Sequence, residues 1–221
     1  IRLPEAPQLD PTLYVSHEGL LLNYEEAQTH QNYNTAAHFL WIGERTRQLD
    51  GAHVEYFRGI SNPIGVKVSS TLSPADLQAL VLLLNPRFEP GRLTLITRYG
   101  ASHVACLKEH VEAIQAIQMP VLWVCDPCHG NTQVVQGKKT RNYETMLEEL
   151  LACVRIHQTC ASHLGGVHLE LTAEDVVECV GGPSEEDWSK YTTLCDPRLN
   201  YTQSLALAWS LGEALGELHA G

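Results

Sequence analysis

Short apolar runs alternate with helix-like segments along almost the whole chain, and this alternation constrains the fold more than any other feature. The apolar runs cover residues 14–22, 39–42, 64–68, 93–97, 121–125 and 167–171, and the run at 121–125 is rich in β-branched and aromatic residues. The helix-like segments cover residues 73–81, 102–118, 143–157, 172–180 and 202–218. Strands that alternate with helices predict an α/β fold with a parallel sheet.

Two helix starts carry capping signals. Ser73 precedes Pro74, which would occupy the first helical position, and this order is typical of a helix start. Thr172 is followed three residues later by Asp175, as in a capping box, so we expect a helix from there to Val180. No low-complexity linker or block of like charges divides the chain. We therefore expect residues 1–221 to form one domain, which is long enough to bury one sizeable core.

Charged and polar side chains lie within or just after most of the predicted strands. In chain order they are Glu44, Arg45, Lys67, Arg98, Asp126, His129, His168, Glu170 and Asp196. His168 and Glu170 are two residues apart and would lie on the same face of a strand. The active site of a (β/α)8 barrel is built from the carboxyl ends of many strands, whereas a doubly wound sheet concentrates it at one switch point. Because the charges are spread over many strands, and no dinucleotide or P-loop motif is present, we favour the barrel.

One group of these residues combines nitrogen and oxygen ligands, namely His129, Glu170 and Asp196. This donor set suits a divalent metal such as Mn²⁺, Co²⁺ or Zn²⁺. Each member also has a structural alternative. His129 could be a hydrogen-bonded structural residue, and Glu170 could pair with His168. Asp196 could form a local salt bridge in a turn.

A second group is cationic and comprises Arg45, Lys67 and Arg98. Arginine offers a planar fork and lysine a point charge for carboxylate or phosphate. Such a cluster beside a metal suits a phosphorylated substrate with a carbonyl to polarise. Arg45 and Arg47, close to Asp50, could instead form a solvated ion-pair surface. Lys67 is harder to explain in this way, since a lysine within an apolar strand must reach a partner or water.

Charge and cysteine content exclude some classes of protein. A formal net charge of -11 argues against nucleic acid or an anionic membrane as a partner. No apolar run approaches the roughly 18 residues needed to cross a bilayer. Seven cysteines without a disulfide-scaffold pattern indicate a reducing compartment. Cys125 and Cys128 form a CxxC pair, but a structural zinc would need a second close ligand pair, and none is suitably spaced.

Seven segments of the chain are distinctive in sequence and in order. They are SHEGLLLNYE (16–25), WIGERTRQLDGAHVEYFRGISNPIGVKV (41–68), PGRLTLITRYG (90–100), VLWVCDPCHGNT (121–132), GKKTR (137–141), GGVHLELTAEDVVECVGG (165–182) and CDPRLNYTQSL (195–205). Together they resemble the class II (plant and microbial) 3-deoxy-D-arabino-heptulosonate 7-phosphate (DAHP) synthases over nearly the whole chain. The resemblance implies a (β/α)8 barrel that condenses phosphoenolpyruvate with D-erythrose 4-phosphate, the entry step of the shikimate pathway to aromatic amino acids.

The resemblance also implies a role for individual residues. The positions that match the family's metal ligands are His129, Glu170 and Asp196. Mn²⁺ is the expected ion, with Co²⁺ or Zn²⁺ as alternatives. The positions that match its phosphoenolpyruvate-binding residues are Glu44, Arg45, Lys67 and Arg98. The residues expected to be catalytic are Lys67, Arg98 and His129.

The chain departs from the family pattern in three places. Nothing matches the GGDCAE-like segment of the first barrel strand, which carries the family's fourth metal ligand, a Cys. The KPR motif of the second strand has no match either, so we expect the chain to supply about the last six β/α units of the barrel. Cys128 stands where the family usually has Met. It could reach the metal or replace a packing residue, and we prefer the second interpretation.

The missing strands leave a second interpretation of function. The chain could be a truncated, non-catalytic homologue or a complementing subunit with a binding or regulatory role. We expect either a homo-oligomer or a complementing amino-terminal segment as its partner, and neither nucleic acid nor a membrane. The resemblance implies the cytoplasm, or the plastid stroma in a plant or alga, as the location.

Overall fold

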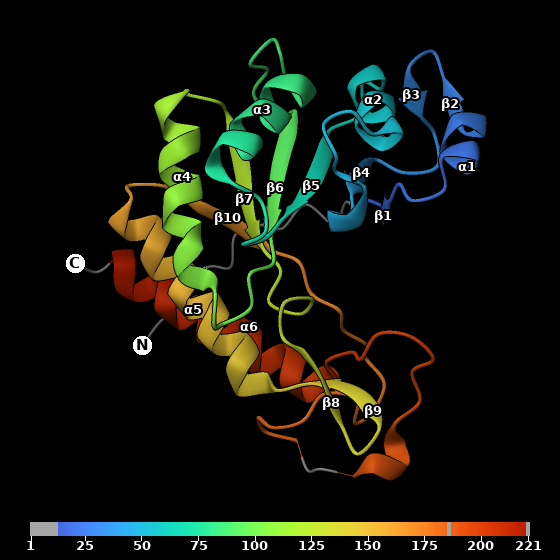
Figure 1. Cartoon of the computed structure of the whole chain (residues 1–221). Coiled ribbons are helices and arrows are strands. Elements are labelled where there is room, and N and C mark those ends of the chain that lie inside the picture. Colours follow the sequence, from blue (N-terminus) through green and yellow to red (C-terminus); the bar gives the residue numbers. More distant parts are fainter. Residues whose placement is uncertain (1–12, 185–186, 220–221) are drawn as a thin grey trace, which may run out of the picture.

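A computed structural model describes residues 13–184 and 187–219 and contains a central parallel sheet (Figure 1). In spatial order its strands are β1 (Ser16–Glu18), β4 (Phe39–Ile42), β5 (Ile64–Val68), β6 (Leu93–Thr97), β7 (Val121–Cys125) and β10 (Leu164–Val167). Every neighbouring pair of these strands runs parallel. The predicted α/β class with a parallel sheet is confirmed.

The four middle strands, β4 to β7, begin and end at the residues predicted from the apolar runs. Their apolar composition is explained by burial, since every residue of β5 is buried. β5 and β6 pair without a register shift, with Ile64 opposite Leu93 and Val68 opposite Thr97. The carboxyl ends of neighbouring strands therefore meet at one edge of the sheet.

The helices are α1 (Leu22–Ala27), α2 (Ala52–Gly59), α3 (Pro74–Leu84), α4 (Leu107–Ala116), α5 (Tyr143–Thr159) and α6 (Tyr201–His219). From α2 to α6 each helix contacts the next, so that they form a continuous row beside the sheet (Figure 1). α3 shows why these segments are helical, because its apolar residues at positions 77, 80, 81 and 84 are all buried in the core. A parallel sheet with one row of helices is consistent with part of a (β/α)8 barrel.

Two helices begin as their sequences predict. The side chain of Ser73 accepts a hydrogen bond from the backbone N–H of Asp76 (3.1 Å), and Pro74 is the first residue of α3. Asn142 caps α5 in the same way by accepting from the N–H of Thr145 (2.9 Å). These bonds satisfy backbone donors that the first helical turn leaves free.

Two antiparallel hairpins interrupt the alternation, and neither was predicted. They are β2–β3 (Thr29–His30 and Tyr33–Asn34) and β8–β9 (Thr132–Val135 and Lys138–Arg141). The second turns through Gln136 and Gly137, whose φ angles of 50° and 77° are those of a two-residue hairpin turn. This hairpin carries the GKKTR segment and lies below the sheet in the view of Figure 1.

The helix predicted over residues 172–180 is wrong, since this segment is irregular. Its backbone donors bond to distant segments and not to the preceding turn. The N–H of Val177 donates to the carbonyl of Lys190 (3.2 Å), and the N–H of Val180 donates to that of Arg141 (2.9 Å). The hydroxyl of Thr172 accepts from the N–H of Glu174 (3.2 Å), which forms a local turn.

Two predicted strands are displaced or shortened. The run over 167–171 begins where β10 ends, so His168 and Glu170 lie beyond the strand and not on one of its faces. The run over 14–22 contains only the three residues of β1, and its last residue already belongs to α1. Within the described residues, every helix is too short or too polar to span a membrane.

Candidate active site

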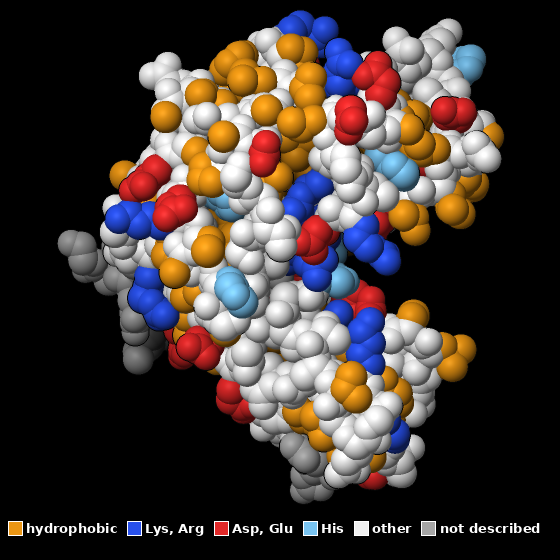
Figure 2. Space-filling view, in the orientation of Figure 1, with side chains coloured by type: hydrophobic (Ala, Val, Ile, Leu, Met, Phe, Trp, Pro, Cys, Tyr) orange, Lys and Arg blue, Asp and Glu red, His pale blue; other side chains and the backbone are white. Residues whose placement is uncertain are grey.

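Polar side chains gather where the carboxyl ends of β4 to β7 and β10 meet. Figure 2 shows a hollow here, between the part that contains the sheet and the part that contains the β8–β9 hairpin, with basic, acidic and histidine side chains around it. The predicted site residues lie on β5, on segments that follow strands, or on the long segment between β10 and α6. They are Glu44, Arg45, Lys67, Arg98, His129, Glu170 and Asp196.

Lys67 and Asp126 form a buried ion pair at the centre of this edge. Lys67 is 5% exposed and Asp126 is 0% exposed. The Lys67 ammonium also lies 5.9 Å from the ring centroid of Trp41. A lysine in a buried strand is stable only with such partners, because burial of an unpaired charge is costly.

Arg98, the residue after β6, links two segments of the site. It forms an ion pair with Glu44, and its Nη2 donates to the carbonyl oxygen of His129 (2.8 Å). Burial tends to raise the pKa of Glu44, but the hydroxyl of Ser69 and the charges of Arg98 and Arg47 hold this pKa below its ordinary value. Glu44 is therefore a carboxylate that neutralises part of the cationic cluster.

Arg47 is a buried part of this cluster that was not predicted as a site residue. Its guanidinium donates to the carbonyl of Lys67 (2.8 Å) and to the hydroxyls of Ser69 (3.2 Å) and Thr71 (2.9 Å). Arg47 thus ties the segment after β4 to the end of β5. Arg45, by contrast, is exposed and has no ion pair within the described part of the chain.

Asp126 orients His129. One Asp126 oxygen, Oδ2, accepts from Lys67 and from Nδ1 of His129 (2.7 Å), and Oδ1 accepts the backbone N–H groups of Cys128 (3.0 Å) and His129 (3.1 Å). Burial would raise the pKa of Asp126, but these partners hold it well below its usual range. The bond to Asp126 fixes one imidazole proton on Nδ1, so Nε2 is the nitrogen that would bind a metal once it has given up its own proton.

Glu170 and Asp196 face this imidazole from the segment between β10 and α6. Nε2 of His129 lies 2.8 Å from Glu170 Oε1 and 3.9 Å from Asp196 Oδ2. The second oxygen of Glu170 accepts from Arg141 (2.7 Å), and Asp196 forms an ion pair with Lys139. Burial tends to raise the pKa of Glu170, but the bonds from His129 and Arg141 lower it to about 2.

The three predicted ligands are close enough to share one metal ion. One ligand atom from each of His129, Glu170 and Asp196 lies within 4.8 Å of the others. One imidazole and two carboxylates fit a divalent ion of intermediate hardness. Cys128 is outside this group; burial raises the pKa of its thiol to about 12, and its sulfur accepts from the N–H of Glu170 (3.5 Å). These contacts agree with a packing role for Cys128.

His168 packs beside the site and does not pair with Glu170. Its ring makes an edge contact with Trp41 (5.0 Å between centroids) and lies 6.2 Å from the ring of His129. Burial, together with the nearby charge of Lys67, lowers the pKa of His168 to about 4. His168 is therefore a neutral, aromatic part of the wall near neutral pH.

Glu149, on α5, fastens the segment after β6 to the segment after β7. Its fully buried carboxylate accepts the N–H groups of Tyr99 (2.9 Å) and Gly100 (3.0 Å) and the amide of Asn131 (2.7 Å). The backbones of the two segments are in close contact at Gly130 and Gly100. A Cβ added to Gly130 would lie only 2.2 Å from the nitrogen of Gly100. Arg98 and His129, which precede these contacts, are thereby held at fixed separation.

Four residues that organise the site were not assigned a role from the sequence: Arg47, Asp126, Arg141 and Glu149. A carboxylate in the apolar stripe of a helix was the available signal for Glu149, since Met146 and Cys153 on the same face of α5 are buried. Arg141 lies in the polar segment 137–141, and nothing in the local pattern indicates that its side chain is buried. Asp126 stands at a strand end, but its contact with Lys67 depends on the tertiary fold.

The chain is similar to known proteins along almost its whole length. The model of the class-II DAHP synthetase family matches residues 5–212. The "phospho-2-dehydro-3-deoxyheptonate aldolase" of Neurospora crassa is 48% identical over 91% of this chain and 48% of its own length. Proteins of the same name are 44% identical in Mycolicibacterium smegmatis, where it is called AroG (92% of this chain, 47% of the relative), and in Streptomyces coelicolor (90% and 47%). The chain spans about half the length of these curated relatives. It belongs to the class-II DAHP synthetase family.

Proposed function

We propose that the chain provides the metal centre and the phosphoenolpyruvate-binding cations of a DAHP synthase. The observation that carries this proposal is the position of Asp126, whose Oδ2 is shared by Lys67 and by His129. One carboxylate thus joins the cationic cluster to the predicted metal ligands. This supports a single site in which an anionic substrate would meet a carbonyl group that a metal could polarise. The family match and the names of the relatives support the same activity.

The proposed reaction joins phosphoenolpyruvate to D-erythrose 4-phosphate. C3 of phosphoenolpyruvate forms a bond to the aldehyde carbon, and the aldehyde oxygen takes up a proton. Water adds at C2, the bond between C2 and the phosphate oxygen breaks, and DAHP and inorganic phosphate leave. A divalent metal held by His129, Glu170 and Asp196 would supply a Lewis acid for the aldehyde oxygen.

The cations position phosphoenolpyruvate for this attack. Arg98 and Lys67 would hold its carboxylate and phosphate, with the exposed Arg45 as a further contact. Arg98 is fixed by Glu44 and by the carbonyl of His129, so its guanidinium has little freedom to move. Such fixed charges orient the nucleophilic carbon and stabilise developing negative charge without reorganisation.

The ligand set supports Mn²⁺ as the ion. Two carboxylates and one imidazole give a donor set that suits Mn²⁺, while Co²⁺ and Zn²⁺ accept the same atoms. A cavity of about 570 Å³ borders Glu170 and Asp196, and this volume is in the range of small-molecule sites. We also propose a reducing compartment, the cytoplasm or a plastid stroma, which suits seven cysteines that are all free.

The partner we propose is a second copy of the chain or a complementing amino-terminal segment. Among the residues that the structure describes, β1 and β10 are the edge strands of the parallel sheet, and each has a neighbour on only one side. Parallel sheets in proteins are normally closed or covered, because free edges are prone to further pairing. A further strand could pair with either edge.

Incubation of the chain with phosphoenolpyruvate, D-erythrose 4-phosphate and Mn²⁺ tests the proposal, with DAHP and phosphate measured as products. The assay is repeated with the amino-terminal half of the Neurospora crassa relative added. Product in either assay supports the proposal, and product only in the second identifies complementation. Absence of product in both assays, with the chain folded and Mn²⁺ present, would refute it. A matched control is the H129A variant, which should form no product in either assay.

A further inference from the structure

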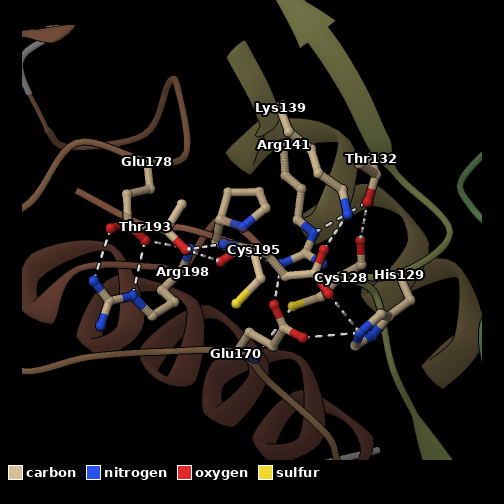
Figure 3. Close-up of polar contacts among 12 residues, drawn as sticks. Cys128, His129, Thr132, Lys139, Arg141, Glu170, Glu178, Thr193, Cys195 and Arg198 are labelled. Carbon is tan, nitrogen blue, oxygen red and sulfur yellow. Dashed lines mark hydrogen bonds and ion pairs between the residues drawn. The ribbon is translucent and has the colours of Figure 1, made fainter. Parts of the chain in front are cut away.

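Arg141 is the largest fully buried side chain of the described residues, and the proposed reaction gives it no task. It is the last residue of β9, and its guanidinium points toward Glu170 (Figure 3). A guanidinium that is 0% exposed needs acceptors, because an unpaired buried charge costs several kcal/mol, on the order of 3–5. Nε and Nη1 have acceptors, and Nη2 has none within the described residues. Its acceptors therefore show what it stabilises.

These acceptors belong to the three segments that carry the metal ligands. Nη1 donates to Glu170 (2.7 Å) and to the carbonyl of Pro197, the residue after Asp196. Nε donates to the hydroxyl of Thr132 (3.3 Å), three residues after His129. One side chain thus contacts one ligand directly and the chain close to the other two.

The backbone of Arg141 is fixed independently of these contacts. Arg141 pairs with Thr132 across the hairpin, and its carbonyl accepts the N–H of Val180 (2.9 Å). The next residue, Asn142, caps α5. The guanidinium consequently projects from a rigid point, whereas Glu170 and Asp196 lie on the long irregular segment between β10 and α6.

We propose that Arg141 is a positioning residue that assembles the metal centre by holding Glu170 and the chain beside His129 and Asp196 in one arrangement. It does not contact the ion. Its planar fork is needed, because a lysine could reach one acceptor but not bridge three segments. Groups that orient metal ligands in this way typically change metal affinity by about 10–100-fold when they are replaced. The inference rests on the proposed function only for the presence of the metal.

The test measures Mn²⁺ binding to the folded chain by calorimetry, without substrates. R141K is expected to weaken binding by about 10–100-fold. The matched control is R92K, the same substitution just before β6 and away from the metal ligands: Arg92 donates to the backbone carbonyls of Asn62 and Phe57 (2.8 Å to Phe57) and contacts no metal ligand. R92K is expected to change Mn²⁺ affinity by less than about three-fold. Equal losses in the two variants, or unchanged affinity in R141K, would overturn the inference.

A second variant covers the case in which R141K does not fold. T132V removes the acceptor of Arg141 Nε, together with a long bond from the same hydroxyl to the carbonyl of Cys128 (3.5 Å), and is expected to weaken Mn²⁺ binding by about three-fold, as the loss of one good hydrogen bond predicts. No change in T132V would then count against the inference. Failure of the unsubstituted chain to bind Mn²⁺ would overturn the metal centre and the role of Arg141 with it. A chain that binds Mn²⁺ but makes no DAHP in either assay, with or without the added amino-terminal half, would refute the proposed function alone.

Discussion

The two halves of the candidate site are held in place by different forces. The cation half (Glu44, Arg47, Lys67 and Arg98) follows strands that pair in an unbroken ladder from β4 to β6. In the ligand half (His129, Glu170 and Asp196), His129 follows β7 and Glu170 follows β10, but the pairing of β10 with β7 contains a register shift between Leu164 and Gly166. Glu170 and Asp196 lie between β10 and α6, where the strand pairing consists of two isolated bridges, at Val180 and between Leu171 and Leu199.

In the ligand half, ion pairs that each have one fully buried member hold the segments in place, whereas the cation half is held by backbone pairing between strands. Arg141 binds Glu170, and Arg198 binds the fully buried Glu178. A backbone ladder does not depend on any one side chain, whereas a buried ion pair leaves an uncompensated charge when one partner is removed. Single substitutions should therefore disturb the ligand half more than the cation half, and residues shared by both halves should matter most.

The largest effect is expected at Asp126, which joins the halves. D126N keeps the shape of the side chain but removes the charge that compensates Lys67 and the strong acceptor for His129 Nδ1. We expect a loss of about 3–5 kcal/mol in the free energy of unfolding, as for other buried pairs that lose one member. Urea unfolding measures this loss, and DAHP formation should fall by at least about 100-fold in the same variant.

The double variant D126N/K67M separates charge balance from function. Removal of both charges should restore most of the stability lost in D126N, because no unpaired ion remains. Activity should not return, since the cation and the acceptor of His129 are both gone. A D126N chain as stable as the wild type would show that the pair does not link the halves energetically.

The next effect is a pH dependence caused by Glu149, which fastens segments of both halves. Burial raises the pKa of Glu149 from 4.5 to about 7, although three N–H donors oppose this shift. The folded chain thus keeps a proton over an interval in which the unfolded chain has released it. Raising the pH from about 4.5 to about 7 therefore removes stability, on the order of 3 kcal/mol in all.

E149Q isolates this contribution because glutamine does not ionise. Between about pH 5 and pH 8 the wild type should lose stability relative to E149Q, as measured by urea unfolding at each pH. E148Q is the matched control: Glu148 is the exposed neighbour on the same helix, and its replacement should leave the shape of the wild-type curve unchanged. Parallel curves for the wild type and E149Q would contradict the prediction.

A smaller loss is expected where the two halves touch through backbone. G130A places a Cβ 2.2 Å from the nitrogen of Gly100, so one of the two segments must move. We expect a loss of about 1–3 kcal/mol, as for other overpacked sites. The control is G212A on α6, where an added Cβ meets nothing within 4 Å and alanine favours the helix. Equal thermal stability of G130A and the wild type would show that the contact is not tight.

The same difference between the halves explains what the sequence could predict. The middle strands and the apolar side of the helices follow from local patterns, because their residues are buried on regular elements. The helix predicted over residues 172–180 does not form, because backbone groups of this segment bond to distant parts of the chain, for example Val180 to Arg141. Periodicity carries no information about such bonds.

The site residues also fall into two groups, those that could be predicted from the sequence and those that could not. Polar side chains at strand ends could be recognised one by one, and the parallel fold brings His129, Glu170 and Asp196 within reach of one another. The residues that hold them, Arg141 and Glu149, act across 29 and 18 or more positions of sequence, respectively. Their partners became visible only once the chain was folded.

The smallest effect on stability is expected at Arg45, and it tests how far the cation half extends. Arg45 is exposed and has no ion pair within the described residues, so R45A should change the free energy of unfolding by less than about 0.5 kcal/mol. If Arg45 contacts phosphoenolpyruvate, loss of one charge-assisted bond should weaken binding by roughly ten-fold, measured by calorimetry with Mn²⁺ present. R58A is the control, since Arg58 is also exposed but pairs with Glu55 on α2. Equal binding in R45A and R58A would restrict the cation half to Lys67 and the arginines that the fold already holds in place.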